Sequence, residues 1–108
     1  VDVLYVPTDN TVASNTEIIN NIFQPAGIPV VTGEEGICAG CGVATLSISY
    51  YDIGYKAGEM AYDILENGKD ISAMKIETAP NVTKMYNPTI CEELGIEVPD
   101  EYEAIEQE

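Results

Sequence analysis

The chain has 108 residues, of which 45% are apolar, and its 19 acidic residues against four lysines give a formal net charge of −15. A chain of this length folds as one domain at most, and the negative charge disfavours binding to nucleic acid or to anionic membrane surfaces. Because the sequence contains no histidine, catalytic groupings of the Ser-His-Asp or Cys-His kind cannot be assembled from it, and an enzyme is not expected.

The first 27 residues read as a strand followed by a helix. Residues 1–7 form a short, nearly continuous apolar run, which predicts a strand buried on both faces. Residues 8–11 are all good helix N-caps. Apolar side chains then recur on one helical face as far as Phe23, and Pro25 and Gly27 follow, which predicts a single helix.

Two more strands are expected in the first half of the chain. Residues 28–33 repeat the apolar, β-branched pattern, and a polar turn at residues 34–36 follows them. A glycine-rich break at residues 40–42 precedes a third strand over residues 43–50. No helix is expected between the second and third strands.

The second half of the chain opens with the clearest helical pattern. Apolar residues at helical spacing predict a helix over residues 51–67, ended by Asn67-Gly68. Residues 74–78 and 82–86 are predicted strands. The alternation of strands and helices indicates an α/β fold with a largely parallel sheet.

The C-terminal region is expected to contain one short helix. Asn87 precedes Pro88, which suits the first helical position, and Gly95 marks the helix end. Pro99 is expected to end the regular structure, and residues 100–108 read as a solvated acidic tail.

Polar side chains follow the first two predicted strands, where open α/β sheets bind their ligands. Thr8, Asp9 and Asn10 follow the first strand, and Glu34 and Glu35 follow the second. The Asp9 carboxylate can pair with an ammonium group, and the Asn10 amide can both donate and accept hydrogen bonds. Helix capping explains the first turn equally well, and the two glutamates can equally be ordinary surface acids.

Cys38 and Cys41 form a C-x-x-C motif that supports an alternative function. Such a motif serves in redox enzymes when it lies at a helix N-terminus, whereas a zinc site needs two further ligands at matched spacing. The only other candidate thiol is Cys91. A thiol or redox protein therefore remains an alternative to two small buried thiols in a glycine-rich turn.

Four blocks of the sequence, taken together, point to a known family. They are residues 5–14 (YVPTDNTVAS), 28–31 (IPVV), 42–54 (GVATLSISYYDIG) and 94–99 (LGIEVP). These blocks closely resemble the C-terminal part of ABC-transporter substrate-binding proteins, in the group that includes tryptophan- and aromatic-amino-acid-binding members. The similarity covers nearly the whole chain except the acidic tail, although the C-x-x-C motif departs from the family pattern.

The resemblance implies a type I periplasmic-binding-protein fold, in which two α/β lobes clamp a ligand. Asp9, Asn10 and Thr8 would contact the ligand from the C-terminal lobe, with Glu34 and Glu35 at the second turn facing the cleft. No catalytic residue, metal or cofactor is implied. Residues 1–42 would belong to the C-terminal lobe, and residues 43–70 would form the hinge strand and its helix. Residues 71–99 would form the segment that leads the chain back from that helix.

The function implied is that of the solute receptor of an ABC importer. It would capture a small polar solute such as an amino acid and pass it to the permease subunits. The location implied is outside the cytoplasm, either in the periplasm or at the outer face of the cell membrane, where a lipoprotein anchor is one option. The chain starts without methionine, so we expect a piece of a larger protein that self-associates through exposed apolar surface. An effector-binding domain of a transcription regulator shares the fold and remains an alternative.

Overall fold

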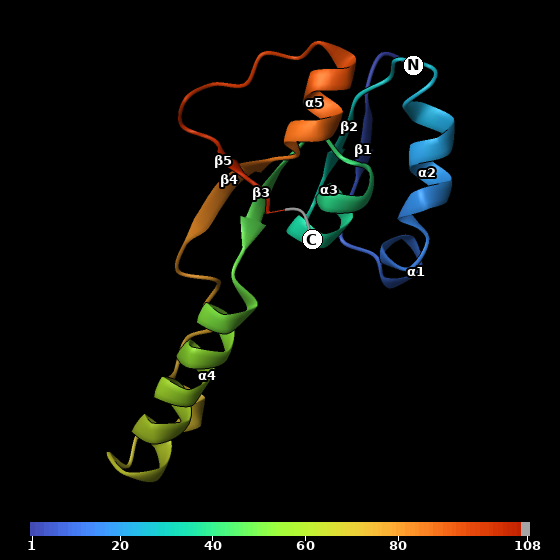
Figure 1. Ribbon diagram of the computed structural model, residues 1–108. Coiled ribbons are helices and arrows are strands. Elements are labelled where there is room, and N and C mark those ends of the chain that lie inside the picture. The colour runs from blue at the N-terminus through green and yellow to red at the C-terminus, as the bar shows by residue number, and fades with distance from the viewer. Residues whose placement is uncertain (107–108) are drawn as a thin grey trace. The chain divides into compact units, whose positions relative to one another are not determined.

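The computed structural model describes residues 1–106 (Figure 1), so the last two residues of the expected acidic tail lie outside the described part. Contacts divide the chain into two units, which are described separately. The first comprises residues 1–47 and 83–106, and the second comprises residues 48–82.

A five-stranded sheet in the order β1-β2-β3-β4-β5 organises the fold. The strands are β1 (Leu4–Val6), β2 (Val30–Thr32), β3 (Ala44–Ile48), β4 (Val82–Tyr86) and β5 (Glu103–Ala104). The pairs β1/β2, β2/β3 and β4/β5 are parallel. The prediction of an α/β fold with a largely parallel sheet is therefore confirmed.

Strand β1 lies at the edge of the sheet and is buried on one face only. Val6 is 6% exposed and packs in the core, whereas Tyr5, which points to the opposite face, is 65% exposed. The prediction of burial on both faces was wrong for this strand. Its apolar run resembled that of a central strand, but only one face is covered by packed side chains.

The helix predicted after β1 is divided into α1 (Asn10–Ala13) and α2 (Thr16–Phe23). Two polar side chains close the end of α1. The Ser14 hydroxyl donates to the Asn10 carbonyl at 3.0 Å, and the Asn15 amide donates to the Thr11 carbonyl at 2.7 Å. Side-chain bonds of this kind compete with helix continuation, which explains why the single predicted helix was wrong.

A helix, α3 (Glu35–Cys41), lies between β2 and β3, where only a turn was expected. Glycine is a poor helix former, and two glycines within seven residues hid this helix from sequence reasoning. Gly40 has a packing role, because a Cβ atom there would lie 2.2 Å from the Thr16 hydroxyl oxygen of α2. The missing side chain lets α2 and α3 pack closely.

The core of the first unit consists of two clusters of buried side chains. Val6, Val30, Ile37 and Cys41 form one cluster, which joins β1 and β2 to α3. Val43, Ile90 and Cys91 form the other. Burial of these apolar side chains is the main favourable contribution to the stability of this unit.

Helix α5 (Pro88–Leu94) begins and ends as the sequence predicted. The Asn87 side chain caps its N-terminus, Pro88 opens it and Gly95 ends it in the left-handed conformation, with φ +68°. Beyond Pro99, however, β5 pairs with β4 and Ile105 is 3% exposed. The predictions that regular structure ends at Pro99 and that the tail is solvated were wrong for this stretch.

The second unit consists of α4 (Tyr50–Leu65), the 3-10 helix η1 (Ile71–Ala73) and the segment that follows it. Helix α4 agrees with the prediction within two residues. Residues 74–78 form no strand, contrary to the prediction. The side chain of Ile76 in this stretch is 98% exposed, so the apolar alternation there does not reflect a buried face.

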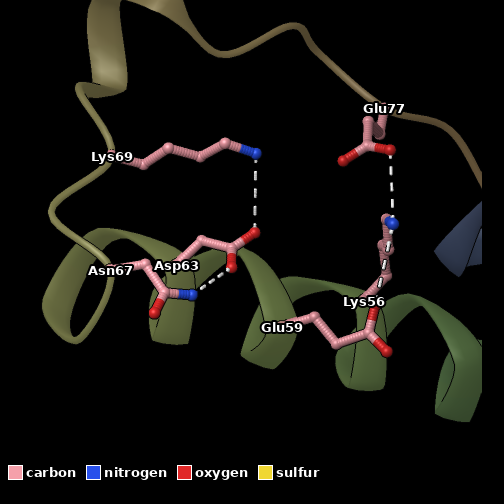
Figure 2. A network of polar contacts seen from close by, with 6 residues as sticks. All are labelled: Lys56, Glu59, Asp63, Asn67, Lys69 and Glu77. Atoms are coloured by element: carbon pink, nitrogen blue, oxygen red, sulfur yellow. Dashed lines mark hydrogen bonds and ion pairs between the residues drawn. The ribbon is translucent and has the colours of Figure 1, made fainter.

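Ion pairs hold the segment after η1 and the turn before it against α4 (Figure 2). The Lys56 ammonium lies 3.3 Å from the Glu77 carboxylate, and the Lys69 ammonium lies 3.6 Å from the Asp63 carboxylate. An apolar groove of about 380 Å³ runs beside the first pair and is lined by Ile53, Met60 and their neighbours. Within residues 1–106, no helix combines the length and apolar character needed to cross a membrane.

Candidate functional site

The two predicted binding segments lie side by side at the carboxyl ends of β1 and β2. The register pairs Val6 with Thr32, and the Gly33 amide donates to the Val6 carbonyl at 2.9 Å. A Cβ atom on Gly33 would lie 2.8 Å from the Thr8 amide nitrogen. The loop that begins at Thr8 is therefore in direct contact with the loop that leads to Glu34.

Asp9 caps helix α1. One of its carboxylate oxygens accepts a hydrogen bond from the Val12 amide at 2.9 Å, and the residue is exposed. Its other oxygen has no partner among the described residues. The capping role that the sequence allowed is thus present in the structure, and it leaves half of the carboxylate available to a ligand.

Asn10 and Thr8 flank this cap and are both exposed. Asn10 is the first residue of α1, and its backbone carbonyl accepts from the amide and the hydroxyl of Ser14. The Asn10 side-chain amide makes no hydrogen bond with the described residues, so it retains two donors and an acceptor. Thr8 is held by its close approach to Gly33.

Glu34 is the N-cap of α3. Its two carboxylate oxygens accept from the amides of Gly36, at 2.9 Å, and of Ile37. The Thr32 hydroxyl donates to the Glu34 carbonyl at 3.1 Å. Glu35 lies in the first turn of α3 and is exposed. Glu34 is therefore engaged in the fold, whereas Glu35 is not.

The charge at these loops is of one sign. Asp9, Glu34 and Glu35 are acidic, and the only lysine within residues 1–47 and 83–106 is Lys84. Lys84 pairs with Glu101 at 2.9 Å. This part of the surface therefore favours the ammonium group or hydroxyl hydrogens of a ligand over its carboxylate.

The C-x-x-C motif lies inside α3 and is part of the core. Cys38 is fully buried and Cys41 is 2% exposed, and both are free thiols. Burial raises the pKa of Cys38 to about 12 and also raises the pKa of Cys41. A redox thiol needs exposure and a lowered pKa, so this geometry argues against the redox alternative. Residues 1–106 contain no grouping of three or more candidate metal ligands.

Sequence reasoning missed two features of the site. The capping role of Glu34 was not anticipated because α3 was not predicted. The role of Gly33, which lets the two loops touch, was also missed, although a glycine placed directly after a predicted parallel strand is a usable signal.

Comparison with known proteins agrees with this architecture. Residues 1–107 match the family described as "ABC transporter substrate binding protein". A protein of Clostridioides difficile named as a tyrosine-binding protein is 37% identical over 87 residues, which cover 81% of this chain and 25% of that protein. This chain thus spans about a quarter of that relative's length.

Solved structures show the same similarity. A ligand-free, open substrate-binding protein with adhesive properties from Clostridium difficile matches with a TM-score of 0.82 and 38% identity, over 100% of this chain and 37% of that one. A Streptococcus pneumonia protein in complex with L-Trp matches with a TM-score of 0.76 and 27% identity, over 93% of this chain and 34% of the other. The chain belongs to the family of ABC-transporter substrate-binding proteins.

Proposed function

We propose that this chain is part of the solute receptor of an ABC importer, which holds an amino acid between two lobes and delivers it to the permease. Its family membership supports the proposal, and so do two relatives that carry tyrosine or tryptophan in their names. In this proposal residues 1–42 belong to the C-terminal lobe, and residues 43–70 form the hinge strand and its helix. Residues 71–99 form the segment that leads the chain back from that helix. The receptor works outside the cytoplasm, held there as a lipoprotein.

The proposed contacts of this chain with the solute come from the two loops at the ends of β1 and β2. One observation carries the proposal: the loop of Thr8, Asp9 and Asn10 touches the loop of Gly33 and Glu34 through Thr8, and Lys84, the only lysine of residues 1–47 and 83–106, is paired with Glu101. The free oxygen of Asp9 and the side chain of Asn10 then bind the ammonium group of the amino acid. Glu34 fixes the second loop, and Glu35 adds negative charge.

Titration calorimetry of the full-length protein with L-tyrosine and L-tryptophan tests this assignment. Asp9→Asn keeps a good helix cap and removes the negative charge. It should weaken binding by about 1–3 kcal/mol, as expected for a lost charged hydrogen bond, and Asn10→Ala should weaken binding by a similar amount. Glu17→Gln, at an exposed acid in the first turn of α2, is the matched control and should leave affinity unchanged.

The outcomes separate the site from the function. If the unaltered protein binds neither amino acid nor any other small solute, the receptor function is wrong. If it binds one of them and neither Asp9→Asn nor Asn10→Ala changes the affinity, the function stands and the site assignment is wrong.

We also propose that the chain by itself associates with a second copy through α4. At about 3.6 residues per turn, the charged side chains of α4 fall in a single sector, which includes Lys56 and Asp63. The rest of its circumference is uncharged and largely exposed, with Tyr51 77% and Leu65 80% exposed. Helices with such a wide apolar surface are normally buried.

Sedimentation velocity on the 108-residue chain tests the association. The chain should sediment as a dimer or larger species, and Tyr62→Glu should shift it towards monomer by placing a charge on the uncharged surface. Glu59→Gln, within the charged sector of the same helix, should not. A purely monomeric chain at all concentrations would contradict the proposal.

A further inference from the structure

The turn that follows α4 contains an exposed Asn-Gly pair, Asn67-Gly68. The Asn67 amide donates to the Asp63 carboxylate at 3.0 Å (Figure 2). The Lys69 backbone amide donates to the Asp63 carbonyl, also at 3.0 Å. Gly68 adopts φ +66°, and a Cβ atom there would meet nothing within 4 Å. Its N–H group makes no hydrogen bond with any of the residues that the structure describes.

We propose that Asn67 is a site of spontaneous deamidation. The Gly68 backbone nitrogen loses its proton to solvent base and attacks the side-chain carbon Cγ of Asn67. A bond from this nitrogen to Cγ forms, the bond from Cγ to Nδ2 breaks, and ammonia leaves, so that a five-membered succinimide results. Water then opens the ring at either carbonyl, which gives aspartate or isoaspartate at position 67. The only co-reactant is water.

The surroundings of Asn67 distinguish it from the other six asparagines of the chain. It is the only one followed by glycine, which presents no side chain to hinder the attacking nitrogen. Asn81 is also exposed but precedes the β-branched Val82. Asn87 is 2% exposed and precedes proline, whose nitrogen has no proton to lose.

Deamidation changes the electrostatics at the end of α4. The amide donor that faces Asp63 becomes a second carboxylate, and Lys69 is then shared between two acids. The new charge also lies near the C-terminus of the helix, where the helix dipole disfavours negative charge. Isoaspartate adds a methylene group to the backbone inside the turn closed by the bond from the Lys69 amide to the Asp63 carbonyl. The last turn of α4 should therefore loosen.

Tryptic peptide mapping tests the proposal because cleavage after lysine isolates the relevant asparagines. The peptide of residues 57–69 contains Asn67 as its only asparagine, and the peptide of residues 76–84 contains Asn81 as its only asparagine. The folded chain is incubated in mildly alkaline buffer, which supplies the base that removes the Gly68 proton. Peptide 57–69 should convert to the acid form at least severalfold faster than peptide 76–84.

Two further measurements complete the test. Methylation by an isoaspartyl methyltransferase should label peptide 57–69, because ring opening yields isoaspartate whereas direct hydrolysis yields only aspartate. Asn67→Gln, which keeps an amide but closes a larger ring, should abolish both signals. Equal conversion rates for the two peptides, or conversion without isoaspartate, would overturn the proposal.

Discussion

The buried side chain of Asn87 makes three hydrogen bonds in the first unit, and replacing it should strongly destabilise the fold. The side chain is 2% exposed. Its amide donates to the carbonyls of Cys38 at 3.2 Å and of Ala39 at 3.1 Å, and its oxygen accepts from the Ile90 amide at 3.2 Å. It therefore joins the end of α3 to the start of α5.

The magnitude for Asn87→Ala follows from these bonds. Loss of the helix cap removes about 1 kcal/mol of stability. The Cys38 carbonyl keeps a bond from the Gly42 amide at 2.9 Å, but the Ala39 carbonyl loses its side-chain partner. An unsatisfied buried carbonyl costs about 1–3 kcal/mol, and the Ala39 carbonyl is only partly buried, so the total loss should be about 2–3 kcal/mol.

Urea unfolding followed by circular dichroism measures this loss. Asn87→Ser, which retains a capping hydroxyl but not the amide donors, should fall between the unaltered chain and Asn87→Ala. The control Asn81→Ala removes an exposed asparagine that bonds to none of the described residues, and it should change little. A loss below about 1 kcal/mol for Asn87→Ala would refute the reasoning. The helix cap alone would account for a loss of that size, and the bonds to the α3 carbonyls would then contribute nothing to stability.

Three further predictions follow from the packing of the first unit. Gly40→Ala would place a Cβ atom 2.2 Å from the Thr16 hydroxyl oxygen and should lower the urea midpoint by forcing α2 and α3 apart. Gly33→Ala would place one 2.8 Å from the Thr8 amide nitrogen, and in the full-length protein it should weaken amino-acid binding in calorimetry. Burial raises the pKa of Cys38 from 9.0 to about 12, so the unfolded chain releases this proton first, and this thiol alone should lower stability between pH 9.0 and pH 12 by about 1.4 kcal/mol per pH unit. Cys38→Ser should make that part of the stability profile measured by urea unfolding less steep, and the remaining slope includes Cys41 and Cys91, whose pKa values burial also raises.

The elements that sequence reasoning found were those with complete local signals. Helix α5 has a capping asparagine, a proline at its first position and a glycine after its end, and α4 has a long apolar pattern. Helix α3 is only seven residues long, and the poor helix formers Gly36 and Gly40 interrupt it. The Glu34 cap supports it locally, whereas its close packing against α2 is a tertiary contact that a single sequence does not reveal.

The placement of the two candidate loops at one edge of the sheet was predictable, and the roles of their side chains in the fold were not. Parallel strands place the loops after β1 and β2 at the same edge of the sheet, and Asp9 and Glu34 each follow one of these strands. A carboxylate at such a loop accepts hydrogen bonds from backbone amides only where a helix starts directly after it, as at Asp9 and Glu34. The strand predicted at residues 74–78 was wrong because a strand needs a neighbouring strand to pair with, and this segment has none.

The capping bond of Asp9 also has a consequence for binding thermodynamics. Because the Val12 amide already fixes one carboxylate oxygen, the side chain is oriented before any solute arrives. An ammonium group that binds the other oxygen therefore freezes little additional rotation of the aspartate, and the entropic penalty of association is smaller than for a freely rotating acid. The same bond that starts a four-residue helix thus preorganises the proposed binding loop.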